Sequence, residues 1–436
     1  MSSEPTPAAV PAPLVARTVE VPVATAEDLL GLLPDSAAPR EIASWVRRGE
    51  GIVGWGRVRA HEVGGEDRFA EAERWWRGVV ADAIVRDVVQ LPGTGPVVFG
   101  SMTFSARSAQ AGVLVVPEVV VGRRGDTAWV TTMTTNATVP AADVTPSPSA
   151  PPVPPEGLRF SDGELSAVAW AGAVEEAVAR ITRGDLDKVV LARSLDADAD
   201  TDLDARWLLT RLAEDYDTTW VFAVDGLLGA TPEMLVRLER GLVTSRVLAG
   251  TIRRTGDDSR DLALAGSLAR SSKDLEEHEY AVRSVADALA PHTSSMNVPE
   301  SPFVLHLSNV MHLATDVAGV IRDDSTSLTL AASLHPSAAV CGTPTPLANA
   351  LIDELEHMDR GRYAGPVGWM DASGDGEWGI ALRCGMLHDD PRSITLYAGC
   401  GIVAGSDATS EVAESEAKFL PMREALAPPR VSPTPT

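Results

Sequence analysis

The sequence predicts a protein of the α+β class, and three observations support this prediction. Short runs rich in valine, threonine and aromatic residues lie between turn signals, which is the pattern of strands. Longer segments repeat apolar residues at helical spacing. Of the 436 residues, 44% are hydrophobic and 22% are charged, which is typical of a soluble globular protein with more than one core-bearing unit.

The N-terminal third is expected to contain several strands and one helix. Strands are predicted at 51–58 and 96–104, and at 112–121 and 127–133 on either side of a Gly-Arg-Arg-Gly-Asp turn. A helix is predicted at 70–85, and its two adjacent tryptophans are interpreted as packing residues. No pattern in this part of the chain indicates catalysis.

A proline-rich segment is expected to divide the chain. Residues 140–157 contain seven prolines and no apolar periodicity, which predicts a stiff connection of polyproline character. The expected organisation is a flexible N-terminus over 1–23, an α+β region over 24–139, this connection, a catalytic region over 158–426 and a flexible tail over 427–436. The catalytic region opens with a helix, because Trp170 and Val174 begin an apolar stripe at helical spacing.

The charge and the cysteines exclude several classes of function. A net charge of −24 opposes nucleic-acid binding, because phosphate contacts supply most non-specific affinity. The three cysteines, Cys341, Cys384 and Cys400, are too few for a disulfide framework and form no zinc-ligand pair. No apolar stretch approaches the roughly 20 residues of a membrane span. We therefore expect a cytoplasmic protein that binds neither membranes nor nucleic acid. A monomer is expected, although the sequence does not fix the oligomeric state.

Two predicted helices place acidic residues one turn apart. Asp274 and Glu277 are three residues apart, as are Glu411 and Glu414, and Lys418 follows the second pair by four residues. Four carboxylates on two opposed helices would suit Mg²⁺, which prefers oxygen ligands and retains several waters. The alternative is two solvated helix faces with Glu–Lys pairs.

Two further ionisable residues have both a structural and a catalytic interpretation. Lys188 alternates with apolar residues on a predicted strand, so it is either an exposed edge lysine or, in a closed site, a base. Glu233 follows a strand and a Thr-Pro turn, which places it in the first turn of a helix or in a site. Tyr363, Arg383 and two glycines of a Gly-Cys-Gly run are expected on hairpin-like strands, where an anion can approach the backbone closely.

Read in order, the second part of the chain contains a long collinear series of motifs. These are KVVLAR, GATPEML, LAGTIRR, KDLEEH, MHLAT, LHPSAAVCG, RGRYAGPVGWMD, IALRCG and AGCGIVAGS, followed by ExxExxxK. The series resembles the chorismate-utilising enzymes over about residues 165–426. Within that group it is most similar to the isochorismate synthases, because KVVLAR supplies the lysine of members that use water as nucleophile and GEW is typical of that branch. The resemblance implies a large chorismate-binding fold with mostly antiparallel sheets flanked by helices.

The resemblance also implies a role for each candidate residue. Lys188 would activate water for attack at C2 of chorismate, and Glu233 would protonate the departing C4 hydroxyl. Glu277 and Glu414 would bind Mg²⁺ directly, and Asp274 and Glu411 would act through its waters. The substrate would be held by a third group of residues. These are Gly250, Thr251, His312, Ala339, Tyr363, Arg383, Gly399, Gly401 and Lys418.

The same resemblance leaves alternatives open. A salicylate synthase would add pyruvate elimination to the isomerisation, but its relatives tend to carry a threonine where this chain has Ala339. An amine-transferring relative is disfavoured by Lys188, and a non-catalytic chorismate-binding paralogue by the full set of acid, base and metal positions. We expect the isochorismate to feed menaquinone biosynthesis, with a catechol siderophore as the alternative.

Overall fold

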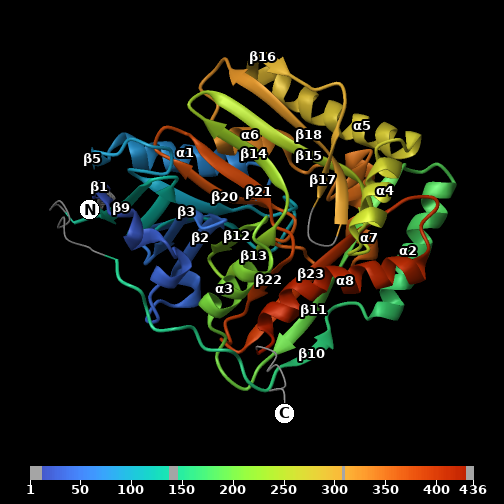
Figure 1. The fold of residues 1–436 in the computed structure, drawn as a ribbon, viewed down its shortest axis with the longest axis horizontal. Coiled ribbons are helices and arrows are strands. Elements are labelled where there is room, and N and C mark those ends of the chain that lie inside the picture. The colour runs from blue at the N-terminus through green and yellow to red at the C-terminus, as the bar shows by residue number, and fades with distance from the viewer. Residues whose placement is uncertain (1–11, 137–145, 307–309, 429–436) are drawn as a thin grey trace, which may run out of the picture.

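Two large β-sheets with helices on their outer sides form the structure (Figure 1). The computed structural model describes residues 12–136, 146–306 and 310–428, without the side chains of Thr251, Lys273 and Glu277. Among these residues one strand pair is parallel, that of β1 with β5, and the others are antiparallel. The expected α+β class, with mostly antiparallel sheets flanked by helices, is confirmed.

The first sheet, here called sheet A, has 13 strands within the described residues. In spatial order they are β10 (Arg159–Asp162), β11 (Lys188–Asp198), β23 (Ser393–Ile402), β22 (Cys384–Leu387), β13 (Leu227–Thr231), β12 (Trp220–Val224), β2 (Ile42–Arg47), β3 (Glu50–Trp55), β8 (Val119–Arg124), β9 (Thr127–Thr134), β1 (Val15–Val21) and β5 (Ile84–Asp87), with β19 (Gly342–Thr343) paired to β11. The strand that begins at Lys188 therefore lies inside the sheet.

The second sheet, sheet B, has ten strands within the described residues. In spatial order they are β16 (Thr293–Asn297), β18 (Val310–Ile321), β15 (Leu242–Arg253), β14 (Met234–Glu239), β21 (Gly376–Ile380), β20 (Pro366–Asp371), β6 (Val97–Ser101), β7 (Gly112–Val116) and β4 (Arg59–Val63), with β17 (Phe303–His306) paired to β18. Strands from both ends of the chain thus share this sheet as well.

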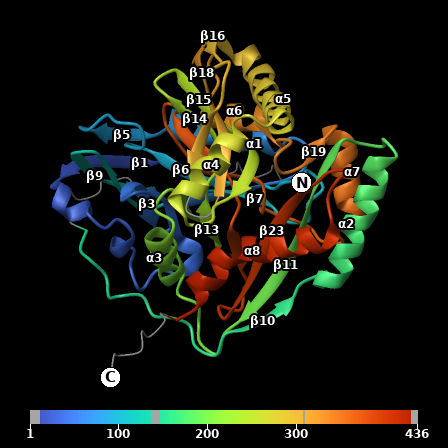
Figure 2. The same cartoon turned by 45° about the vertical axis from the view of Figure 1, so that its right-hand side comes forward.

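The helices cover the outer faces of the two sheets. They are α1 (Arg68–Ala81), α2 (Ala167–Thr182), α3 (Ala205–Asp215), α4 (Asp258–Leu268), α5 (Ser272–Leu289), α6 (Ser327–Leu334), α7 (Thr345–Leu355) and α8 (Ala408–Leu426). Helices α5 and α6 pack on sheet B, whereas α3 and α8 pack on sheet A. Helices α2 and α7 lie beside β11 (Figure 2). None of the helices in the described residues is long and apolar enough to span a bilayer.

The two faces of sheet A contribute to two separate cores. One core joins apolar residues of both sheets, including Trp45, Phe99 and Trp378. The other lies between sheet A and α3 and α8, and includes Leu209 and Phe419. Burial of apolar surface on both faces stabilises the central strands and fixes their register.

The structure corrects several expectations about the N-terminal third. Residues 15–21, expected to be flexible, form β1 inside sheet A. The predicted strand 112–121 is interrupted at Pro117 and forms β7 in sheet B and β8 in sheet A, since proline cannot donate a ladder hydrogen bond. The predicted helix 70–85 ends at Ala81, and its last residues belong to β5.

The proline-rich segment does not separate two sheets. Both sheets contain strands from before and after residues 140–157, so the segment joins two parts of the same pair of sheets. Residues 137–145 of it lie outside the described residues, and 146–157 carry no helix or strand. The α2 helix follows as predicted, with Trp170 and Val174 buried and Ser166 capping its first turn at 3.2 Å from the Ala169 amide.

Candidate active site

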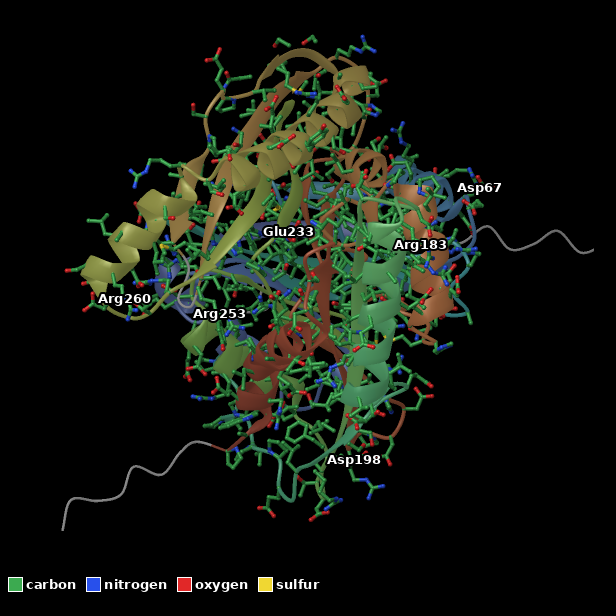
Figure 3. The ribbon with its side chains drawn as sticks, turned by 90° about the vertical axis from the view of Figure 1, so that its right-hand side faces the viewer. Asp67, Arg183, Asp198, Glu233, Arg253 and Arg260 are labelled. Carbon is green, nitrogen blue, oxygen red and sulfur yellow. The ribbon has the colours of Figure 1, made fainter. Side chains whose placement is uncertain are left out.

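Glu233 lies at the junction between the two sheets. It occupies the short connection between β13 of sheet A and β14 of sheet B, so the expectation of a first helical turn is wrong. Its main-chain carbonyl accepts a hydrogen bond from the Ile380 amide at 3.1 Å, which ties the connection to the end of β21. Figure 3 shows Glu233 near the middle of the molecule, between the strands of sheet B and helix α8.

The carboxyl of Glu233 is suited to donate a proton near neutral pH. Although part of the side chain remains accessible, the surrounding protein desolvates the carboxyl and raises its pKa to about 7. Lys188 and Lys418 act in the opposite direction and lower this pKa, so both amines lie near the carboxyl. A carboxylic acid with this pKa is half protonated at neutral pH, which is what a general acid requires.

Lys188 begins β11 and is half-buried. Its backbone pairs with Thr343 on one side, and the next residue, Val189, pairs with Ile402 on the other. The interpretation as an exposed edge lysine is therefore wrong. A Cβ at position 401 would lie 3.2 Å from Lys188 Cε and 3.8 Å from Nζ, so Gly401 leaves room for the lysine side chain along β23.

Helix α8 presents Glu411, Glu414 and Lys418 on one side. Lys418 Nζ forms an ion pair with Glu414 at 2.8 Å and donates a hydrogen bond to the Gly399 carbonyl at 2.8 Å. Burial opposes ionisation of Glu414, but Lys418, and to a smaller extent Arg253 and Arg383, lower its pKa. Glu411 has less compensation, and burial raises its pKa.

These carboxylates fit a hard cation. One ligand atom each of Cys400, Glu411 and Glu414 lies within 4.8 Å of the others. Burial raises the pKa of the Cys400 thiol to about 12, so the thiol is neutral, and its Sγ points to the Glu411 carbonyl at 3.6 Å. The ionisable donors are therefore two carboxylates, which match the oxygen preference of Mg²⁺.

The second acidic helix lies against the β15 bulge. A Cβ at Gly250 would be 3.1 Å from Asp274 Cβ, and Gly250 has a φ of +75°, so glycine is favoured here on two grounds. The pairing of β15 with β18 shifts register at this point. Asp274 therefore faces the strand that carries Gly250. The side chain of Glu277, the predicted direct ligand, lies outside the described residues, and its metal role stays a prediction.

His312 lies opposite Thr251 in the pairing of β18 with β15. Desolvation, together with the charges of Arg383 and Lys418, lowers the pKa of His312 to about 4. The imidazole is therefore neutral at pH 7 and available as a hydrogen-bonding group. The side chain of Thr251 lies outside the described residues, so its substrate role remains a prediction.

Tyr363 and Arg383 lie beside β23, although neither is on a strand as expected. Tyr363 is in the turn before β20, and Arg383 is in the loop between β21 and β22 with a φ of +48°. The Tyr363 hydroxyl would be 3.0 Å from a Cβ at Gly399, so a side chain there would displace it. Burial lowers the pKa of the Arg383 guanidinium, and Glu414 partly opposes this shift.

Ala339 is exposed in the turn between α6 and β19. No described contact joins it to the other candidate residues. Sequence reasoning missed two contributors to the electrostatics of the site: Arg253, which lowers the pKa of Glu414, and Tyr216, which opposes the lowering of the Arg383 pKa. Figure 3 shows Arg253 at the end of its strand, on the same side of the molecule as α4. Arg253 lies within the LAGTIRR motif, which assigned roles only to its glycine and threonine, whereas Tyr216 belongs to none of the spaced motifs.

Comparisons with known proteins identify the family and the fold of the chain. The family model described as "Chorismate binding enzyme" matches residues 13–427. Isochorismate synthase DhbC of Bacillus subtilis is 41% identical over 269 residues, which are 59% of this chain and 67% of that protein. The salicylate biosynthesis isochorismate synthase of Pseudomonas aeruginosa is 30% identical over 95% of this chain and 90% of its own length. The structure of MenF, the menaquinone-specific isochorismate synthase of Escherichia coli, has a TM-score of 0.78 over 97% of both chains at 24% identity, which shows a shared fold.

Proposed function

Because the chain belongs to the family of chorismate-binding enzymes, we propose that it is an isochorismate synthase, an isomerase that interconverts chorismate and isochorismate with Mg²⁺. The observation that carries the proposal is the acid at the junction of the sheets: a Glu233 carboxyl with a pKa of about 7, near the amines of Lys188 and Lys418. A proton donor beside a lysine is the pair that water addition and hydroxide loss require.

The proposed reaction uses Lys188 and Glu233 on the two reacting positions of the ring. Lys188 takes a proton from a water molecule as the water oxygen bonds to C2. The ring double bonds shift, the C4–O bond breaks, and Glu233 gives its proton to the departing hydroxyl, which leaves as water. One water is consumed and one is released, so substrate and product are isomers and the reaction runs in both directions.

Mg²⁺ supplies the positive charge that a dianionic substrate needs in a protein of net charge −24. Glu414 and Glu277 would hold the ion directly, and Glu411 and Asp274 would hold its waters. Arg383 and Lys418 add fixed positive charge on the β23 side of the site. The Lys418 amine is held by the Gly399 carbonyl at 2.8 Å, which keeps it over that strand.

The remaining residues shape the pocket in this proposal. The glycines at 399 and 401 leave room for Tyr363 and Lys188, respectively, and for close approach of the substrate carboxylates to the backbone. Neutral His312 and the strand at Gly250 and Thr251 line the opposite wall, on sheet B.

Oxygen isotope labelling tests the proposed route. In H₂¹⁸O the label should enter the C2 hydroxyl of isochorismate, while the C4 oxygen of chorismate is lost to solvent. Retention of the original C4 oxygen in the product would exclude water addition at C2. Lys188→Ala should abolish label incorporation in the same assay.

The pathway is proposed to be that of menaquinone. Isochorismate is also a precursor of catechol siderophores, so the same activity serves either route. Deletion of the gene should lower menaquinone and leave siderophore output unchanged, and the reverse result would assign the enzyme to siderophores.

A further inference from the structure

Arg193 links the strand that carries the base to the helix that carries the metal carboxylates. It lies on β11, five residues after Lys188, and its side chain is 0% exposed. Its Nε donates a hydrogen bond to Ser415 Oγ at 3.0 Å, and its Nη2 forms an ion pair with Glu416. Its guanidinium also lies 5.2 Å from the ring centroid of Phe419.

The contacts of Arg193 follow one stripe of α8. Ser415 Oγ, which accepts the hydrogen bond from Arg193 Nε, donates a hydrogen bond to the Val412 carbonyl at 2.8 Å. The three contacted positions, 415, 416 and 419, have the spacing of a single helix face. Glu411, Glu414 and Lys418 occupy the adjacent face of the same three turns. The arginine therefore contacts the helix next to its functional residues without contacting those residues.

We propose that Arg193 is a positioning residue that fixes the rotation of α8 about its axis and so aims Glu411 and Glu414 at the metal. This inference rests on the proposed function, because it assigns the carboxylates to a bound cation. Side-chain ends lie about 5 to 6 Å from a helix axis, so a rotation of about 20° would move them by about 2 Å. Metal–ligand distances tolerate deviations of only about 0.2 Å, so even a small rotation of the helix would weaken metal binding.

The charge on Arg193 makes this contact specific. A buried guanidinium needs partners, because an unpaired buried charge is costly. Nη1 has no hydrogen-bond partner among the described residues, and the nearest other carboxylate, Asp162, lies at 4.0 Å. Ser415 and Glu416 of α8 thus supply the described hydrogen-bonding partners of its guanidinium. Rotation of the helix away from β11 would remove both of these partners and leave the guanidinium with only the longer ion pair to Asp162 of β10.

Arg423 provides a matched control. It contacts the same Glu416 at 3.3 Å, but it belongs to α8 itself and its side chain is 38% exposed. Replacing Arg423 removes a positive charge from Glu416 without releasing the helix from β11. Arg193→Met and Arg423→Met therefore make the same chemical change on the two sides of one carboxylate.

Mn²⁺ binding to the purified full-length protein, followed by electron paramagnetic resonance without substrate, tests the inference independently of turnover. Arg193→Met and Arg193→Lys should each weaken Mn²⁺ binding by about tenfold, the lower end of the effect of removing a supporting residue around a metal. Arg423→Met should change the Mn²⁺ affinity by less than about twofold. The lysine variant keeps the charge but cannot reproduce the planar fork of donors.

Ser415→Ala keeps the inference falsifiable if both Arg193 variants fail to fold. It removes one hydrogen bond from the contact and should weaken Mn²⁺ binding by more than Arg423→Met does. Folded Arg193 variants, or Ser415→Ala, that bind Mn²⁺ as tightly as the unmodified protein would overturn the inference. If these variants bind normally while the unmodified protein makes isochorismate, only the positioning role fails. An unmodified protein that binds no Mn²⁺ would contradict the inference together with the proposed metal site.

Discussion

Replacing Glu233 with glutamine should abolish turnover and, at alkaline pH, stabilise the fold. Burial raises the pKa of Glu233 from 4.5 to about 7 in the folded protein. Each pKa unit corresponds to about 1.4 kcal/mol, so the ionised carboxylate lowers the free energy of unfolding by about 3 kcal/mol. The folded protein is therefore more stable while this carboxyl is protonated. That extra stability is fully present below pH 4.5 and is lost as the pH rises through about 7. Glutamine cannot ionise, so the variant should not show the loss.

Melting temperatures at pH 5 and pH 8 measure this effect. For a chain of 436 residues the entropy of unfolding is about 0.9 kcal/mol/K, so 3 kcal/mol corresponds to a gain of about 3 °C for Glu233→Gln at pH 8. At pH 5, just above the ordinary pKa of 4.5, the gain should fall to about 1 °C. Glu276→Gln, on the exposed side of α5, is the matched control and should shift neither value. An equal shift for Glu233→Gln at both pH values would refute the raised pKa and with it the assignment of the acid.

Four further tests address the metal site, the base, the choice of product and a buried ion pair. Glu414→Ala or Glu277→Ala should abolish activity while circular dichroism shows an intact fold, and excess EDTA should do the same; full turnover in any of these tests would rule out the metal role. Lys188→Ala should lower the single-turnover rate by at least about 10²-fold while chorismate affinity changes far less, and equal losses would make the residue a binding group. Ala339→Thr should raise pyruvate release, measured with a lactate dehydrogenase coupled assay, and an unchanged rate would remove Ala339 from the determinants of product choice. Arg360 forms a buried ion pair with Glu356 at 2.5 Å, so Arg360→Met should leave that carboxylate without its ion-pair partner and lower the free energy of unfolding by about 3 to 5 kcal/mol in urea titrations; a loss below about 1 kcal/mol would contradict this.

Local patterns in the sequence predicted the helices of the site well. The acidic spacing on α5 and α8 and the apolar stripe on α2 are properties of consecutive residues, and the helices formed where those patterns lie. That Lys188 and Glu233 share one site was predicted only from the family resemblance. No local pattern relates two residues on different strands.

The errors arose where distant segments decide the structure. The lysine at the start of β11 looked like an edge residue because its neighbours in the sheet, β19 and β23, follow it by more than 150 residues. Glu233 looked like the start of a helix because a strand that leaves one sheet for another has no sequence signature of its own. The break at Pro117 was visible, but the assignment of β7 and β8 to different sheets depends on tertiary packing.

Product analysis from both directions tests the central claim most directly. Purified protein with Mg²⁺ should convert chorismate to a mixture with isochorismate, and should reach the same ratio when supplied with isochorismate. Chromatography of the two reactions at neutral pH, with pyruvate measured in parallel, gives the answer. One shared ratio with little pyruvate is the predicted result. Stoichiometric pyruvate with salicylate, or no conversion in either direction, would contradict the assignment as an isochorismate synthase.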